Sequence, residues 1–202
     1  MDVEAVRWLL TDEGQGLLAT AESLEEPDPL RARERLARSA PGIPAAYVAT
    51  ALTQAELRRK GAEKFGDLAA VMYFTPDGLE QSTRLTVAQH RAARMKAFDA
   101  TTVVDLGCGI GGDLVAFARA GLTAAGVDLD PVRVALAEAN LAALGLAGAV
   151  GVSDATGVDV APFDVAFADP ARRNGRGRTF SLEEWTPPWS LLASGTSSPA
   201  SC

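Results

Sequence analysis

The apolar positions of the chain follow two different periods, one in each half. In the first half they recur every three or four residues, which is typical of helices. Breaks that contain proline separate a helix predicted over 30–38 from one over 45–64, which should end at Gly61 or Gly66. We therefore predict a mainly helical region over residues 1–98.

Two local features are expected before the first strand. A short apolar run over 72–74 should stop at a turn over 75–78, where proline and glycine favour a change of direction. Ser82 or Thr83 is then expected to cap a helix that leads to the strand. We interpret His90 on that helix as a structural residue, because no obvious partner for acid–base chemistry accompanies it.

The second half alternates short β-type runs with helical segments. The runs cover residues 103–104, 123–127, 149–152 and 163–168. Asp130 and Pro131 should cap and start a long helix between the second run and the third. This alternation predicts an α/β fold with a doubly wound parallel sheet, whose ligands lie beyond the carboxyl ends of the strands.

A glycine-rich turn follows the first strand and leads into a helix. Glycine lets the backbone turn sharply and approach a ligand, and the helix N-terminus offers free N–H groups. Gly107, Gly109 and Gly112 satisfy the Rossmann dinucleotide fingerprint, which keeps an NAD-dependent dehydrogenase as an alternative. Two details favour another cofactor. Gly111 adds a further glycine, and Asp105 stands where a carboxylate suits an ammonium group better than a pyrophosphate.

An aspartate ends or soon follows each predicted strand. The four are Asp105, Asp128, Asp154 and Asp169. Because parallel strands end at the same edge of a sheet, we expect these side chains to line one crevice. Four acids in register, with the glycine loop at the first of them, are hard to assign to chance, so the pattern predicts a ligand site rather than four unrelated caps.

Composition restricts the other functions. The formal net charge is −7 and the pI is about 4.8, which argues against binding nucleic acid by bulk charge, although four arginines fall within residues 172–178. No run of about 18 apolar residues occurs, so we expect no membrane span. Cys108 and Cys202 give neither a disulfide framework nor metal-ligand spacing. We expect no metal site and a cytoplasmic protein.

The stretch from Asp105 to Gly111 resembles motif I of the class I S-adenosylmethionine-dependent methyltransferases, and 126–130 and 153–155 are similar to motifs II and III. The resemblance implies a Rossmann-like domain with S-adenosylmethionine as cofactor. The residues that it implies are Asp105, Gly107, Gly109 and Gly111 at the methionine part, Asp128 at the ribose, Leu129 beside the adenine, and Asp154 with Ala155 at the adenine edge.

Asp169, Pro170, Ala171 and Arg172 occupy the position of motif IV, beside the methyl group in such enzymes. The resemblance implies that Asp169 and Pro170 hold the acceptor and that Arg172 contacts phosphate or base. Methyltransferases of nucleobase amino groups have a second proline and an aromatic residue where this chain has Ala171 and Arg172. The loop is also similar to that of ribosomal RNA uracil-C5 methyltransferases, but these need a downstream cysteine, and only Cys202 follows.

A longer pattern resembles bacterial, especially actinobacterial, methyltransferases with a THUMP-like domain. Its segments are 75–81, 90–92, 109–113 and 169–173, within a likeness that runs from Leu18 to Trp189. By analogy with THUMP proteins, this resemblance implies an RNA substrate but does not imply which base is the target. We expect methylation of an RNA nucleobase.

The predicted sheet has four strands, whereas class I methyltransferases usually have seven. We therefore expect a cofactor-binding domain over 99–189 that is incomplete, followed by a disordered tail over 190–202 in a truncated or frame-shifted product. The leading hypothesis is a methyltransferase acting on RNA. The alternative is a catalytically incomplete fragment that keeps the cofactor pocket, or only its fold.

Overall fold

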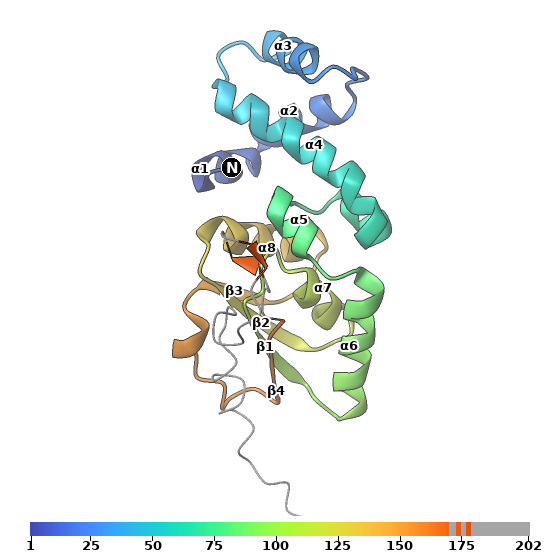
Figure 1. The fold of residues 1–202 in the computed structure, drawn as a ribbon, viewed down its shortest axis with the longest axis vertical. Helices are drawn as coiled ribbons and strands as arrows, with labels where there is room; N and C mark the ends of the chain where they lie inside the picture. The colour runs from blue at the N-terminus through green and yellow to red at the C-terminus, as the bar shows by residue number, and fades with distance from the viewer. Residues whose placement is uncertain (170–172, 175–176, 179–202) are drawn as a thin grey trace, which may run out of the picture.

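The computed structural model describes residues 1–169, 173–174 and 177–178. Its N-terminal helices form one end of an elongated molecule, and the sheet with its helices forms the other (Figure 1). The elements before the sheet are α1 (Val3–Leu9), α2 (Asp12–Glu22), α3 (Pro29–Ser39), α4 (Ala45–Phe65), the 3₁₀ helix η1 (Gly66–Ala70), α5 (Pro76–Gln81) and α6 (Leu85–Ala97). The predicted helical character of this region is confirmed.

Local signals place the ends of these helices. The side chains of Asp2, Thr11 and Asp28 accept hydrogen bonds from backbone N–H groups in the first turns of α1, α2 and α3. Of the two glycines predicted to end α4, Gly66 is the C-cap, with a φ of 57°. Gly61 lies inside the helix, where an added Cβ would come within 2.9 Å of the Phe74 ring.

Two expectations about residues 75–84 are wrong. The segment 75–78 is the start of α5 and not a free turn, because Thr75 accepts a hydrogen bond from Gly78 N–H and proline occupies the first helical turn. Neither Ser82 nor Thr83 caps α6, whose N-cap position is held by Arg84 without a side-chain cap. The Ser82 hydroxyl instead donates to the Gly78 carbonyl, and Thr83 contacts Arg91 and Asp169. Proline and Thr suit turns and helix starts alike, so the local sequence did not separate them.

The second half contains the predicted parallel sheet. Its strands are β1 (Thr102–Leu106), β2 (Thr123–Asp128), β3 (Ala149–Val152) and β4 (Val165–Phe167), in the order β3-β2-β1-β4. Helices α7 (Gly112–Arg119) and α8 (Pro131–Ala143) connect the strands, and Asp130 caps α8 as expected. The short elements η2 (Ala155–Gly157), β5 (Arg173–Asn174) and β6 (Gly177–Arg178) complete the described part. The α/β fold with an N-terminal helical region is confirmed.

Two hydrophobic clusters build the core. One joins the N-terminal helices to α8 and reaches Ile110 in the glycine loop, while the other fills the sheet around Val103, Leu114 and Phe117. Asn140 of α8 is fully buried. Its side-chain N–H groups donate to the Tyr73 carbonyl at 3.0 Å and to the Ile110 carbonyl at 2.8 Å. The helical region therefore packs directly against the loop that follows β1.

Candidate functional site

The glycine loop between β1 and α7 adopts backbone angles that favour glycine. Gly107, Gly109 and Gly111 have φ values of 104°, 55° and 80°. The N–H groups of Gly107 and Cys108 both donate to the Val127 carbonyl at 2.9 Å, which ties the loop to the end of β2. A Cβ added at Gly109 would meet no atom within 4 Å. The loop is thus a fixed turn with open space above Gly109.

Asp128 closes the other side of this space at the end of β2. Its Oδ2 accepts from Gly109 N–H at 3.0 Å and its Oδ1 accepts from Asp130 N–H at 2.9 Å. The neighbouring Leu129 has 57% of its surface exposed although it is apolar. Asp128 and Leu129 thus present a fixed carboxylate and an apolar surface at the same strand end.

Asp105 lies deepest among the acids, with 3% of its surface exposed. Burial raises its pKa well above the usual range, and the nearby carboxylates of Asp113, Asp169 and Asp128 raise it further. Arg91 acts in the opposite direction. Three of the four predicted acids, Asp105, Asp128 and Asp169, are therefore close enough to interact.

Asp154 follows β3, the edge strand of the sheet, and is exposed. Its Oδ1 accepts from the N–H and the hydroxyl of Thr156, at 2.8 and 2.7 Å, and these bonds lower its pKa. Ser153 N–H donates to the Asp128 carbonyl at 3.1 Å, so the ends of β2 and β3 are joined. Ala155 begins the short helix η2 directly after this junction.

Asp169 follows β4 and is held by a residue that the sequence-based prediction of the site omitted. Arg91 of α6 donates to Asp169 Oδ2 at 2.9 Å, and also to Asp113 Oδ1 at 3.0 Å and Thr83 Oγ1 at 3.2 Å. The Arg91 guanidinium lies 5.1 Å from the centre of the Phe167 ring. One cation therefore joins α6, the first turn of α7 and the loop after β4.

Burial and charge act against each other in this group. Burial raises the pKa of Asp113, whereas Arg91 lowers it, and the net shift is upward. Burial lowers the pKa of Arg91, but Asp113 and Asp169 outweigh this and raise it overall. Arg91 is 78 residues from Asp169 and 22 from Asp113. The only sequence signal was the presence of Arg91 and Asp113 in segments whose sequence led us to expect a likeness to THUMP-like methyltransferases.

The remaining predicted site residues, Pro170 and Arg172, lie outside the described residues. Cys108 is buried, and this burial raises the pKa of its thiol. The nearby carboxylates of Asp105 and Asp128 raise that pKa further. The thiol also packs against Gly126, whose added Cβ would lie 3.1 Å from Sγ. This environment disfavours a thiolate, so Cys108 acts as a small apolar residue of the loop.

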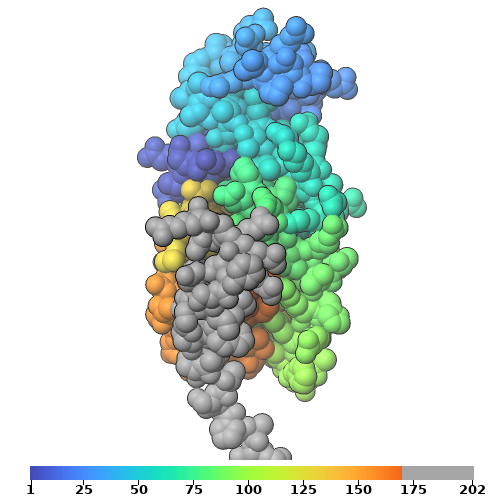
Figure 2. All heavy atoms as spheres, in the orientation of Figure 1, coloured from blue at the N-terminus to red at the C-terminus, as the bar shows by residue number. Residues whose placement is uncertain are grey.

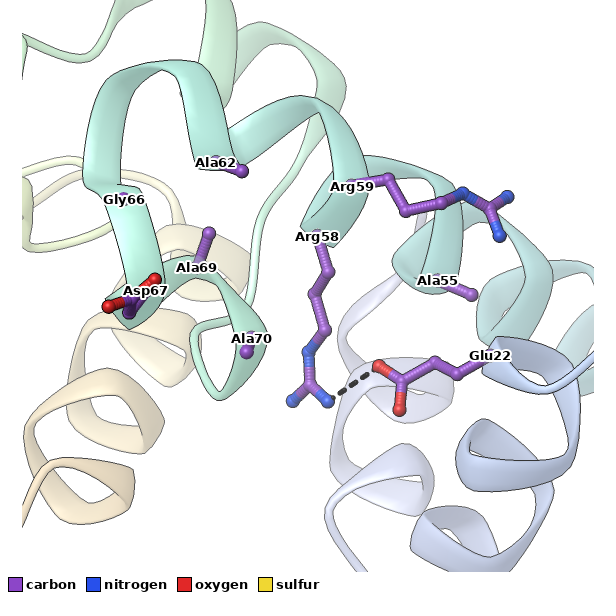
Figure 3. Close-up of a pocket in the computed structure, with 9 residues that line it drawn as sticks. All are labelled: Glu22, Ala55, Arg58, Arg59, Ala62, Gly66, Asp67, Ala69 and Ala70. Carbon is purple, nitrogen blue, oxygen red and sulfur yellow. Dashed lines mark hydrogen bonds and ion pairs between the residues drawn. The ribbon is translucent and has the colours of Figure 1, made fainter.

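A separate hollow of about 480 Å³ lies between α2, α4 and η1 (Figure 3). Arg58 crosses it and donates to Glu22 at 2.9 Å, to the Met72 carbonyl at 2.9 Å and to the Val71 carbonyl at 3.2 Å. None of the residues that line it comes from the sheet. We interpret this hollow as a feature of helix packing, because its main cation is already bound to protein groups.

Residues 1–169, 173–174 and 177–178 contain neither a candidate metal centre nor a candidate membrane span. No group of three or more His, Cys, Asp or Glu side chains in this part of the chain could hold a metal ion. No helix there is both long and apolar enough to cross a membrane.

Family comparisons agree with the fold. Residues 103–172 match the family model of a methyltransferase domain, and residues 2–61 match that of a domain of unknown function. The first match covers the glycine loop and all four strand ends. Together with the parallel sheet, this match supports the predicted Rossmann-like methyltransferase fold of residues 103–172.

Individual relatives are named as methyltransferases. An uncharacterized S-adenosylmethionine-dependent methyltransferase of Mycobacterium tuberculosis is 38% identical over 136 residues, which are 65% of this chain and 37% of the relative. The chain thus spans well under half the length of these curated relatives. A crystal structure from Porphyromonas gingivalis W83, assigned to the methyltransferases, matches 96% of this chain and 45% of its own with a TM-score of 0.65 and 21% identity. That structural match supports the fold of the part of the chain that the structure describes.

Proposed function

We propose that the chain binds S-adenosylmethionine at the loop after β1 and takes part in methyl transfer to an acceptor near Asp169, with a nucleobase of RNA as the acceptor. The observation that carries the proposal is the position of Asp128, whose carboxylate is fixed by Gly109 and Asp130 opposite an open glycine turn. The cofactor named in the curated relatives is the one that this arrangement suits.

The described residues fit the parts of this cofactor. Asp128 would accept the two ribose hydroxyls and Leu129 would cover one face of the adenine. Asp154 would accept a hydrogen bond from the adenine amino group with Oδ2, which accepts none from the described residues. Ala155, the next residue, would adjoin the same edge of the adenine. A buried carboxylate with a raised pKa is stabilised by a cation, so Asp105 would favour the methionine ammonium group.

The glycines would complete the pocket. Gly107, Gly109 and Gly111 give the turn its left-handed angles, and a side chain at Gly111 would press on Ala137 of α8 at 3.1 Å. When bound, S-adenosylmethionine supplies an electrophilic methyl group on a sulfonium sulfur. The protein's contribution to the reaction would be to hold donor and acceptor at reacting distance and to exclude water.

Asp169 is the described residue best placed to receive the acceptor. Arg91 fixes one of its oxygens, Oδ2, and leaves Oδ1 without a hydrogen bond to the described residues. An amino or imino N–H of a nucleobase could donate to Oδ1, with Pro170 and Arg172 adjoining in the sequence. An RNA acceptor also follows from the likeness to methyltransferases with a THUMP-like domain, and it would place the protein in the cytoplasm.

Calorimetric titration of the 202-residue chain with S-adenosylhomocysteine tests the cofactor site, with NAD as the control. We expect micromolar binding of S-adenosylhomocysteine and no heat from NAD. Binding of NAD alone would favour the dehydrogenase. A folded chain that binds neither would support the alternative of a fragment that keeps only the fold. If product binds, transfer of a labelled methyl group to RNA tests the acceptor.

A further inference from the structure

Helix α6 carries an unusual stretch of charge for this chain. The chain has 26 acidic and 19 basic residues, yet residues 81–98 contain four basic residues and no Asp or Glu. Two of the four are neutralised: Arg84 pairs with Glu63 at 2.8 Å, and Arg91 pairs with Asp113 and Asp169. The side chains of Arg94 and Lys96 are exposed and form no ion pair or hydrogen bond with the described residues.

The unpaired Arg94 belongs to a stripe of residues that passes the candidate site. Val87, Arg91, Arg94 and Phe98 are spaced by four, three and four residues, so they share one side of the helix. We call these four residues the α6 stripe. Ala88 and Ala92 on the neighbouring side are buried, which fixes how the helix is turned.

The α6 stripe combines an unpaired cation, Arg94, with two exposed apolar side chains. Val87 has 46% of its surface exposed, and Phe98 has 79%. Because Arg91 contacts Asp169, the stripe passes the acceptor side of the candidate site, and its part from Arg91 to Phe98 is about 10 Å long. In Figure 2 the green atoms of α6 form one edge of the lower half of the molecule.

We propose that the α6 stripe is a docking surface for single-stranded RNA. Arg94 would contact a backbone phosphate, and a base would stack on the exposed ring of Phe98. An unpaired cation beside an exposed aromatic ring is the combination by which proteins bind single strands without reading sequence. A length of about 10 Å corresponds to roughly three stacked nucleotides. The inference deepens the proposed function, because it names the surface that leads an RNA acceptor to Asp169.

A simpler role for the two free cations is to stabilise the C-terminus of α6. Arg94 and Lys96 both lie in the last turn, where positive charge interacts favourably with the helix dipole. Lys96 does not lie on the α6 stripe, since it is two residues from Arg94 and projects from another side of the helix. The Lys96→Glu variant therefore matches Arg94→Glu in charge change and helix-end effect, and differs in its position relative to the stripe.

The test is binding of a fluorescent single-stranded RNA of mixed sequence, about 20 nucleotides long, to the full chain by anisotropy at several salt concentrations. We expect Arg94→Glu and Phe98→Ala each to weaken the affinity by about tenfold, and Lys96→Glu by less than about threefold. Arg94→Glu should also lower the slope of log affinity against log salt by about one.

Three outcomes would overturn the docking surface: no RNA binding by the unchanged chain, equal losses from Arg94→Glu and Lys96→Glu, or a dimer in light scattering that Phe98→Ala dissociates. Titration with S-adenosylhomocysteine separates this result from the proposed function. The three variants should bind it like the unchanged chain. RNA binding with the expected pattern but without product binding would support the surface and contradict the methyltransferase proposal.

Discussion

The side-chain amide of Asn140 holds the backbone of Tyr73 through a pair of hydrogen bonds. Tyr73 N–H donates to Asn140 Oδ1 at 2.6 Å, and Asn140 Nδ2 donates to the Tyr73 carbonyl at 3.0 Å. The same Nδ2 donates to the carbonyl of Ile110. One buried amide therefore joins the segment before α5, the helix α8 and the glycine loop. A buried polar side chain is stable in such a place only when its groups are paired, as they are here.

Replacement of Asn140 by the similarly shaped leucine should destabilise the fold by about 3 kcal/mol, because several buried backbone groups lose their partners. Gln54→Met is the matched control. Gln54 accepts one bond from Phe74 N–H at 3.2 Å, and its own Nε2 is buried without a hydrogen-bond partner among the described residues. Its replacement should cost about 1 kcal/mol. Urea unfolding measures both, and equal losses would contradict the anchoring role of Asn140.

Gly78 provides a second test of the contact between the helical region and the glycine loop. A Cβ added there would lie 2.6 Å from Ile110 Cγ2 and 2.6 Å from Thr75 Oγ1. Gly78→Ala should therefore cost about 1–3 kcal/mol and weaken binding of S-adenosylhomocysteine. Gly16→Ala is the control in another helix, since no atom lies within 4 Å of its added Cβ. It should leave stability unchanged or raise it by up to about 1 kcal/mol. Similar thermal unfolding of the two variants would show that α5 can move away from Ile110 at little cost.

Asp128→Ala tests the proposed ribose contact. The loss of a fixed carboxylate should weaken binding of S-adenosylhomocysteine by roughly 100-fold in calorimetry. Asp159→Ala removes the same charge from an exposed position, where the carboxylate accepts only from Ala161 N–H, and should leave the affinity unchanged. An Asp128→Ala chain that remains folded and binds as tightly as the original would remove the ribose role.

The raised pKa of Asp105 should make the free energy of unfolding depend on pH. Its pKa is raised in the folded state by burial and by neighbouring acids, so the folded chain binds more protons than the unfolded chain above pH 4. The free energy of unfolding should therefore fall as pH rises from about 4 through the folded pKa. Asp105→Asn should remove this part of the fall, so its stability relative to the original should increase over that range. Urea unfolding at several pH values measures the difference, and parallel curves would contradict the burial argument.

Asp105→Asn should have the opposite effect on the cofactor site. If Asp105 receives an ammonium group, the neutral amide should weaken S-adenosylhomocysteine binding by about tenfold even where it stabilises the fold. A gain of stability with unchanged affinity would leave Asp105 as a buried acid without a cofactor role.

The sequence predicted the sheet well because its signals are local. Val103 and Val104 mark a buried strand, the proline after Asp130 marks a helix start, and the glycines after β1 are needed at left-handed angles. The segment 75–78 was misassigned because Thr followed by proline is compatible with a turn and with a helix cap.

The positions of the candidate site residues were predictable only where these residues follow strand ends. The positions of Asp105, Asp128, Asp154 and Asp169 follow from the order of strands in a parallel sheet. Arg91 could not be found in this way, because its contacts with Asp113 and Asp169 depend on how α6 packs against α7. Tertiary packing decides which of many arginines meets a distant acid.

The hydrogen bonds of Asn140 give the two halves of the chain a reciprocal relationship. A ligand that restricts the glycine loop would restrict Ile110, and through Asn140 it would slow amide hydrogen exchange at Tyr73. By thermodynamic linkage, a partner that orders the helical region through the same bonds would raise cofactor affinity. The cofactor would raise the affinity for that partner by the same factor.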